Sequence, residues 1–344
     1  MRQLLNTLYV MTPNAYVRLE NDTLRVEVEH EKKLQVPLHH LGAVVVFGDV
    51  LVSPAVICRC AEDGRSLVFL DRNGAFKARV EGPVSGNILL RQAQFLAAQD
   101  VAKTFDMARA IIAGKLRNSR QVLLRGARDA HDAADKSSLG TAADRLAASL
   151  RSADVATDID ELRGVEGEAA RSYFEALTAV MKSDVRSDFA MNGRSRRPPR
   201  DRINALLSFA YALVMNDCRA AVEGVGLDAQ LGFLHAMRPG RAALALDLME
   251  EFRAVLGDRL VLTLINRGQI TKKDFVDRPG GAVYLADDAR KTVVVAYQER
   301  KQEEVTHPLL ETKAPIGLLP HLQARLIART LRGDMEGYVP FLYK

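Results

Sequence analysis

The chain has 344 residues, of which 48% are hydrophobic and 26% are charged. These fractions are typical of a globular protein, so they exclude a disordered, collagen-like or disulfide-scaffold chain. The longest unbroken apolar runs, such as residues 43–47, are far shorter than the roughly 20 residues of a membrane-spanning helix, and the first residues show no signal-peptide pattern. We therefore expect a cytoplasmic protein with no membrane contact.

Short strands are expected over the first 80 or so residues. Apolar and polar residues alternate strictly from Leu24 to Glu29, which is typical of a half-buried antiparallel strand, and Asn-Asp, Asp-Gly and Asn-Gly pairs mark the turns. The expected strands are residues 8–10, 16–20, 23–29, 33–37, 42–47 and 66–70. We expect a β-sandwich-like unit.

The three cysteines cannot all pair with one another. Cys58 and Cys60 are two residues apart, a spacing that indicates one face of a strand rather than a metal-binding turn, and Cys218 is distant in sequence. We expect three reduced thiols and no zinc site.

From about Asn87 the apolar residues recur with helical spacing. The expected helices are residues 102–128, 142–151, 168–182, 202–222, 241–256 and 320–331. Residues 260–265, 282–285 and 292–297 read as strands of a small hairpin sheet, and residues 129–161, which lack an apolar stripe, read as a surface helical excursion or a mobile segment. The fold class is therefore α+β, with an N-terminal β-strand domain (1–85) and a larger, mainly α-helical domain (86–344).

The net charge is +5, and one segment concentrates positive charge next to two prolines. Its arginines are Arg194, Arg196, Arg197, Arg200 and Arg202. Such a segment suits a polyanion, because prolines oppose a continuous helix and clustered cations attract phosphates. A solvated loop that serves only solubility is the alternative.

Motifs for covalent or nucleotide chemistry are missing from the sequence, which has no phosphate-binding loop and no Gly-x-Ser-x-Gly element. What remains is a set of acids and one imidazole. Asp247 and Glu250 are three residues apart, so they share one helix face; His235 follows an apolar run in an expected loop; Glu166 lies between glycines where an expected helix begins.

Each of these residues also has a structural interpretation. Glu166 can interact with the helix dipole as a first-turn acid, His235 can be a hydrogen-bonded core histidine, and Asp247 can pair with Arg241 or Arg253. As a set, two or three carboxylates and one imidazole match a Mg²⁺ or Mn²⁺ site, since these ions prefer oxygen ligands and the single nitrogen favours Mn²⁺.

These residues together resemble the family of CRISPR-associated protein one, the endonuclease and integrase of bacterial immune adaptation, with most likeness to its type I variants, subtype C. The likeness extends over nearly the whole chain. The matching segments begin at Gly86, Gly114, Val165, Arg196, Asn204, His235, Asp247 and Gln323.

The resemblance implies roles for individual residues. Glu166, His235 and Glu250 match the family's metal ligands, and Asp247 matches an acidic residue one turn earlier that supports the ion directly or through water. Other members often carry Asp where this chain has Glu250, so the resemblance leaves open which of Asp247 and Glu250 touches the metal. Glu168 and Glu251 are neighbouring acids of lower rank.

The resemblance also implies an activity and partners. The expected reaction joins the 3′-hydroxyls of captured foreign DNA to a CRISPR repeat by transesterification, with Mg²⁺ or Mn²⁺ and double-stranded DNA. The expected assembly is a homodimer formed through the β domains, bridged by CRISPR-associated protein two. The residues expected to contact the DNA backbone are Lys115, Arg194, Arg196, Arg197, Arg200 and Arg202.

Two rival hypotheses remain from the residues alone. They are a non-catalytic DNA-binding scaffold and a metal-dependent hydrolase of another substrate.

Overall fold

A computed structural model describes residues 5–82, 88–195 and 198–343. The chain forms two compact units. The first contains residues 1–86 with 301–303, and the second contains residues 87–300 and 304–344. The expected boundary between residues 85 and 86 lies outside the described residues.

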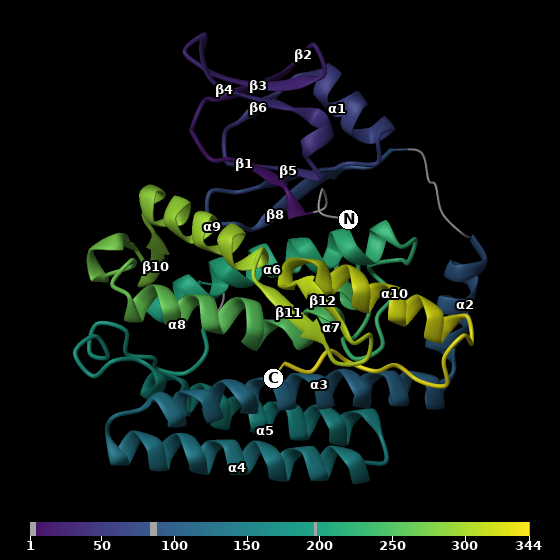
Figure 1. Cartoon of the computed structure of the whole chain (residues 1–344), viewed down its shortest axis with the longest axis vertical. Helices are drawn as coiled ribbons and strands as arrows, with labels where there is room; N and C mark the ends of the chain where they lie inside the picture. The colour runs from purple at the N-terminus through teal and green to yellow at the C-terminus, as the bar shows by residue number, and fades with distance from the viewer. Residues whose placement is uncertain (1–4, 83–87, 196–197, 344) are drawn as a thin grey trace. The chain divides into compact units, whose positions relative to one another are not determined.

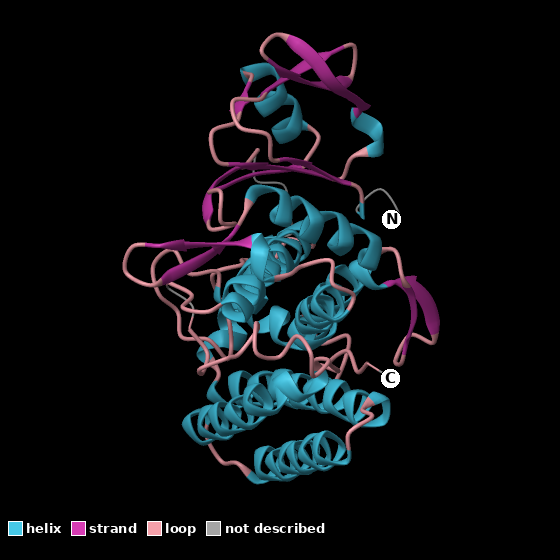
Figure 2. Cartoon of the chain, turned by 90° about the vertical axis from the view of Figure 1, so that its left-hand side faces the viewer, coloured by secondary structure: helices cyan, strands magenta, loops and turns pink. Residues whose placement is uncertain are grey.

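The first unit contains two four-stranded sheets with α1 (Pro54–Glu62), and Figure 2 shows its strands in magenta. One sheet has the order β1 (Thr7–Val10), β5 (Ala43–Phe47), β7 (Ser66–Leu70) and β8 (Phe76–Val80). The other has the order β4 (Glu31–Pro37), β3 (Thr23–Val28), β2 (Tyr16–Glu20) and β6 (Leu51–Val52). Strand β5 pairs in parallel with both β1 and β7, and β2 pairs in parallel with β6, whereas the other pairs are antiparallel.

The alternation that predicts the strand at residues 23–29 also places the apolar side chains of β3 in the core of this unit. Leu24 and Val26 point inward from β3, and Val17 lies opposite Val26 on β2. Side chains of both sheets and of α1 share one buried cluster. The strand-rich character of the first 80 residues is therefore confirmed.

The expectation that Cys58 and Cys60 share a strand face is wrong, because both lie in helix α1. Ser53 caps this helix by accepting a hydrogen bond from the Val56 amide, and Pro54 occupies its first turn. Both are strong helix-start signals. Helical geometry turns the two thiols in different directions, so Cys58 is exposed and Cys60 is buried; both, like Cys218, are free thiols.

The second unit is mainly helical, as Figure 1 shows. Its helices are α2 (Ile88–Gln99), α3 (Val101–Asp129), α4 (Ala133–Val155), α5 (Ile159–Leu177), α6 (Arg202–Gly224), α7 (Ala243–Phe252), α8 (Arg259–Asn266), α9 (Asp287–Lys301) and α10 (Leu319–Leu331). Two hairpins accompany them, β9 (Phe275–Arg278) with β10 (Ala282–Leu285) and β11 (Glu304–His307) with β12 (Thr312–Pro315). Short helical turns of this unit span Thr178–Val180, Lys272–Asp274 and Ile316–Leu318, and a π-helical turn spans Arg253–Asp258; one further short turn, Leu38–His40, belongs to the first unit.

Helices α3, α4 and α5 contact one another and form one layer of this unit (Figure 1). Helix α4 begins at Asp132, whose carboxylate accepts a hydrogen bond from the Ala134 amide, and it buries Leu139 and Leu146. Residues 129–161 therefore form an ordered helix and the start of another rather than a mobile segment.

Two of the three expected strands in the C-terminal half are wrong. Residues 260–265 belong to α8 and residues 292–297 to α9, whereas residues 282–285 form β10 as expected. A short apolar run is compatible with a strand or with a buried helix, and periodicity alone does not separate them. Here Leu260, Val261, Leu262, Leu264 and Ile265 are all buried, so this helix is buried on several sides and shows no single apolar face.

Helix α6 is the core helix of the second unit. Among the described helices it alone is long and apolar enough to span a membrane by length and composition, but 61% of its apolar window is buried inside the protein. Core helices commonly show this combination. The helix starts at Asp201, which accepts a hydrogen bond from the Asn204 amide at 2.8 Å.

Candidate functional site

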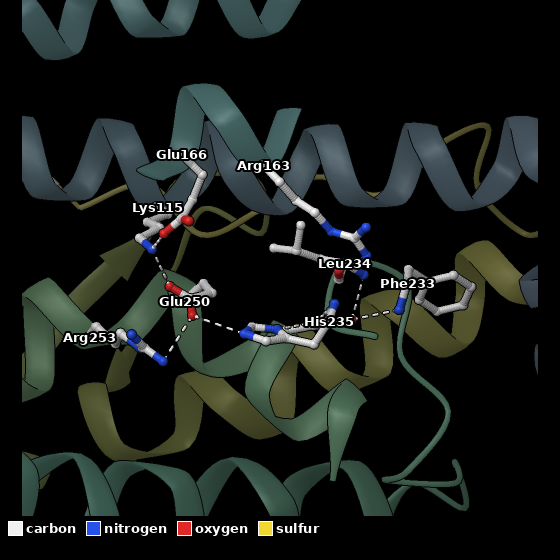
Figure 3. Close-up of polar contacts among 9 residues, drawn as sticks. Lys115, Arg163, Glu166, Phe233, Leu234, His235, Glu250 and Arg253 are labelled. Atoms are coloured by element: carbon white, nitrogen blue, oxygen red, sulfur yellow. Dashed lines mark hydrogen bonds and ion pairs between the residues drawn. The ribbon is translucent and has the colours of Figure 1, made fainter. Parts of the chain in front are cut away.

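Side chains from four separate segments of the second unit meet at one place (Figure 3). Lys115 comes from α3, Glu166 from α5, His235 from the loop before α7, and Glu250 from α7. The structure therefore brings together the three residues expected to bind a metal, and it adds Lys115 to them.

Glu166 lies in the middle of α5. The expectation that it begins a helix is wrong, because Asp158 is the N-cap and accepts hydrogen bonds from the amides of Asp160 and Glu161. A Cβ atom added at Gly164 or Gly167 would meet nothing within 4 Å. The glycines near Glu166 are thus exposed on the surface of α5, with no packing that requires glycine.

Asp247 holds the loop that carries His235. The Oδ2 atom of Asp247 accepts hydrogen bonds from the amides of Phe233 (2.6 Å) and Leu234 (3.0 Å), and Oδ1 accepts one from the His235 amide (2.9 Å). Oδ1 also lies 2.7 Å from His235 Nδ1. Asp247 is fully buried, and both of its carboxylate oxygens are bonded to this loop. The alternative in which Asp247 pairs with Arg241 or Arg253 is therefore wrong.

The same loop is tied to α5 by Arg163, one turn before Glu166. Its Nη2 donates to the Leu234 carbonyl oxygen at 2.9 Å. The positions of Glu166 and His235 are therefore linked through one arginine.

Glu250 is buried among cations. Its Oε1 lies 3.0 Å from Arg253 Nη2 and 3.7 Å from His235 Nε2, and its Oε2 lies 2.8 Å from Lys115 Nζ. Burial by itself would raise the pKa of Glu250, but the charges of Arg253, Lys115 and His235 outweigh it and lower this pKa to about 2. Glu250 is therefore ionised throughout the neutral range.

Arg253 belongs to the π-helical turn that follows α7. Its guanidinium packs over the Tyr211 ring at 5.2 Å, and the Tyr211 hydroxyl donates to Asp258 Oδ1 at 2.5 Å. A π turn inside a helix often marks a functional site, because it re-aims side chains by part of a turn. Arg253 is the first residue of this turn, and its guanidinium contacts Glu250, three residues earlier, at 3.0 Å.

The ammonium of Lys115 bridges the two carboxylates, since it contacts Glu166 Oε1 as well as Glu250. A cation position therefore exists between Glu166 and Glu250, and the imidazole of His235 lies at the other carboxylate oxygen of Glu250, 3.7 Å from Oε1. Two carboxylates and one imidazole form a donor set that suits Mg²⁺ or Mn²⁺. Within the described residues no three His, Cys, Asp or Glu side chains are grouped tightly enough to hold an ion as they stand. Ion binding at this place requires the ammonium to move.

Comparison with known proteins identifies the family. The family model described as CRISPR associated protein Cas1 matches residues 8–299. This chain belongs to the Cas1 family. Relatives named CRISPR-associated endonuclease Cas1 include one from Moorella thermoacetica, 58% identical over 344 residues, and one from Rhodospirillum rubrum, 51% identical over 348 residues; each alignment covers 100% of both chains.

Solved structures share the Cas1 fold at lower sequence identity. A Cas1 protein from Thermotoga maritima aligns with a TM-score of 0.83 and 22% identity, covering 98% of this chain and 100% of its own. A casposase bound to an integration product aligns with the same TM-score and 21% identity, covering 97% and 92%. The α+β fold class expected from the sequence is confirmed.

The arginine-rich segment of this Cas1-family chain is partly engaged within the fold. Arg194 Nη1 donates to Asn204 Oδ1 at 2.5 Å and its guanidinium packs over the Tyr211 ring at 5.3 Å, while Arg202 Nη1 donates to the Asp188 carbonyl oxygen at 2.8 Å. Arg200 is exposed. Arg196 and Arg197 lie outside the described residues. Contact with DNA stays a prediction for all of them.

The sequence did not identify Arg253 as the partner of Glu250 or Arg163 as the partner of the Leu234 carbonyl. Arg253 was noted only as a partner for Asp247, although its position three residues after Glu250 is a spacing that pairs side chains on a helix. Arg163 has no sequence signal of this kind, because its partner is a backbone carbonyl 71 residues away.

Proposed function

We propose that this chain is a divalent-metal-dependent DNA endonuclease and integrase of CRISPR adaptation. Its full-length relatives are named CRISPR-associated endonucleases. The observation that supports the proposal for the site is the position of Glu250, which shares the Lys115 ammonium with Glu166 through one oxygen and faces the His235 imidazole with the other.

We assign Glu166, His235 and Glu250 as the ligands of Mg²⁺ or Mn²⁺. When bound, such an ion polarises a phosphoryl oxygen and lowers the pKa of an attacking hydroxyl. Asp247 accepts the hydrogen on His235 Nδ1, so Nε2, which faces Glu250, is the ring nitrogen that would bind the ion. Since the Asp247 oxygens are used by the loop, we assign the direct contact to Glu250 and a supporting role to Asp247.

The proposed reaction is a transesterification. The 3′-hydroxyl oxygen of a captured DNA end attacks a phosphorus atom at the edge of a CRISPR repeat, and the bond to another 3′-oxygen breaks, so one phosphodiester forms as one is lost. With water as the nucleophile, the same site hydrolyses DNA. Arg253 keeps Glu250 ionised, and the ammonium of Lys115, once displaced from the carboxylates, is available to a DNA phosphate.

The proposal includes partners and a location. Double-stranded DNA is the substrate, as captured fragment and as repeat, and the exposed Arg200 is a candidate for contact with its backbone. We place the chain in the cytoplasm, as a homodimer formed through its first unit and joined to CRISPR-associated protein two (Cas2). Among the structures that share its fold is a Cas6-RT-Cas1–Cas2 complex.

A strand-transfer assay tests this proposal. The protein, with and without the companion protein two, is mixed with Mn²⁺ or Mg²⁺, a short duplex with free 3′-hydroxyls and a supercoiled plasmid that contains the repeat. We expect metal-dependent nicking and joining that Glu166→Ala abolishes. Glu168→Ala, an exposed acid on the same helix, is the matched control and should keep full activity.

The outcomes separate the hypotheses. Intact chemistry in Glu166→Ala would refute the assignment of the ligands. Tight DNA binding without chemistry, even with protein two, would instead favour a DNA-binding scaffold.

A further inference from the structure

Residues 338–343 are inserted between helices of the second unit. Phe341 is 1% exposed, and its ring stacks on Phe252 at 6.0 Å and lies 5.7 Å from the ring of His307. Residues 338–343, which we name the C-terminal segment, therefore pack directly against the end of α7, the helix that carries Glu250.

Asn118 holds the backbone of this segment to α3. Its Nδ2 donates to the carbonyl oxygens of Phe341 (2.8 Å) and Glu251 (2.9 Å), and its Oδ1 accepts from the Tyr343 amide at 2.8 Å. Asn118 is fully buried. One side chain thus connects α3, α7 and the C-terminal segment, and it lies one helical turn beyond Lys115.

Glu251 holds the segment from the side of α7. Its Oε2 accepts hydrogen bonds from the Phe341 amide (2.7 Å) and Gln323 Nε2 (3.0 Å), and its Oε1 accepts one from the Tyr338 hydroxyl. The carboxylate is fully buried and contacts Tyr338, Phe341 and Gln323, whereas its neighbour Glu250 contacts Lys115. Both sides of α7 are therefore fixed by polar contacts, one at the site and one at the segment.

Pro340 fills the space over Gly114, the residue before Lys115. A Cβ atom added at Gly114 would lie 2.6 Å from Pro340 Cβ and 3.4 Å from Glu251 Cγ. The close approach of the segment to α3 therefore needs glycine at this position.

We propose that the C-terminal segment is a positioning element of the candidate site. It lies between α3 and α7 and, through Asn118 and Glu251, sets the separation of Lys115 from Glu250 and the place of Glu250 next to Glu166 and His235. Displacing the segment lets α7 shift relative to α3, so the metal affinity falls although no ligand is changed. The inference rests on the proposed metal-binding function.

The test is a Mn²⁺ titration of the full chain, followed through the EPR signal of free Mn²⁺. We expect Phe341→Ala to raise the Kd about tenfold, in the range found when groups that orient metal ligands are removed. Val339→Ala, in the same segment with an exposed side chain, should leave the Kd within about twofold. The titration separates unfolding from a change in affinity. Unfolding of part of the sample lowers the number of Mn²⁺ sites per chain, whereas a displaced ligand raises the Kd and leaves one site per chain.

A second pair of variants covers the case in which Phe341→Ala does not fold. Gly114→Ala keeps every contact residue but pushes Pro340 away, and Gly140→Ala is its control, because a Cβ atom at this helical glycine meets nothing within 4 Å. We expect a raised Kd for Gly114→Ala only. If folded Phe341→Ala or Gly114→Ala binds Mn²⁺ at one site per chain with an unchanged Kd, this inference alone is overturned. If the unmodified chain has no Mn²⁺ site, the proposed metal site and this inference are overturned together.

Discussion

The Oδ1 atom of Asp247 lies 2.7 Å from His235 Nδ1 and also accepts the His235 amide at 2.9 Å. A single buried oxygen thus holds both the ring and the backbone of the histidine. An ionised carboxylate only accepts, so Nδ1 donates to Asp247, and the other ring nitrogen, Nε2, faces Glu250 Oε1 at 3.7 Å. Asp247 and Glu250 therefore have different tasks, although they share a helix face.

The first prediction concerns Asp247→Asn. The amide keeps one oxygen but replaces the other acceptor with a donor, so it cannot serve all three loop amides and the Nδ1 hydrogen. We expect Mn²⁺ affinity to fall about 10- to 100-fold, with a matching loss of strand transfer. Calorimetric Mn²⁺ titration at neutral pH measures this, and unchanged affinity would show that Asp247 does not orient the histidine.

The second prediction concerns Lys115→Met. Removing the ammonium leaves Glu166 and Glu250 without the cation between them, so the metal-free protein should unfold at a lower temperature. Mn²⁺ should then raise the Tm of the variant more than that of the unmodified chain, since an ion at this position no longer competes with the ammonium. Thermal melts in chelator and in Mn²⁺ measure both effects. Lys103→Met, on the same helix and 70% exposed at its side chain, should change neither.

The third prediction is a pH dependence of stability from Glu251. Burial raises its pKa to about 7 from the ordinary 4.5, although hydrogen bonds from Tyr338, Phe341 and Gln323 lower it in part. The folded state therefore binds the proton more tightly than the unfolded state. This contribution is fully present below about pH 4.5 and is lost as the pH rises through 7.

The expected size of this loss is roughly 3 kcal/mol of unfolding free energy between pH 4.5 and 8. In Glu251→Gln, which does not titrate, that part of the pH dependence should disappear. Urea unfolding at several pH values measures it. Parallel pH profiles for the two proteins would mean that Glu251 is not the titrating group.

The fourth prediction separates two arginines of one segment. Arg200 is exposed, so Arg200→Ala should weaken DNA binding, reduce the slope of log affinity against log salt by about 1, and leave the Tm unchanged. Arg194 packs on Tyr211 and bonds Asn204, so Arg194→Met should lower the Tm instead. Binding isotherms at two salt concentrations with thermal melts check both, and an unaltered salt slope in Arg200→Ala would remove Arg200 from the interface.

The sequence by itself determined the features that depend on local spacing. Alternation predicted the strands of the first unit, and the helical period from residue 87 predicted most helices of the second. The spacing of neighbouring residues also predicted that Asp247 and Glu250 share one face of α7 and that His235 lies in a loop. It failed for residues 260–265 and 292–297, because the period of a short continuous apolar run does not distinguish a helix from a strand.

Only the tertiary structure decided what each polar group does. Asp247 and Glu250 are one turn apart, yet Asp247 faces the amides of residues 233–235 and Glu250 faces cations from α3 and from the π-helical turn. Lys115, Glu166 and Glu250 come from three helices separated by 51 and 84 residues, and no local pattern encodes their meeting. Long-range packing brings these charges together, and burial then makes their pairing decisive, since an unpaired charge in this interior would be costly.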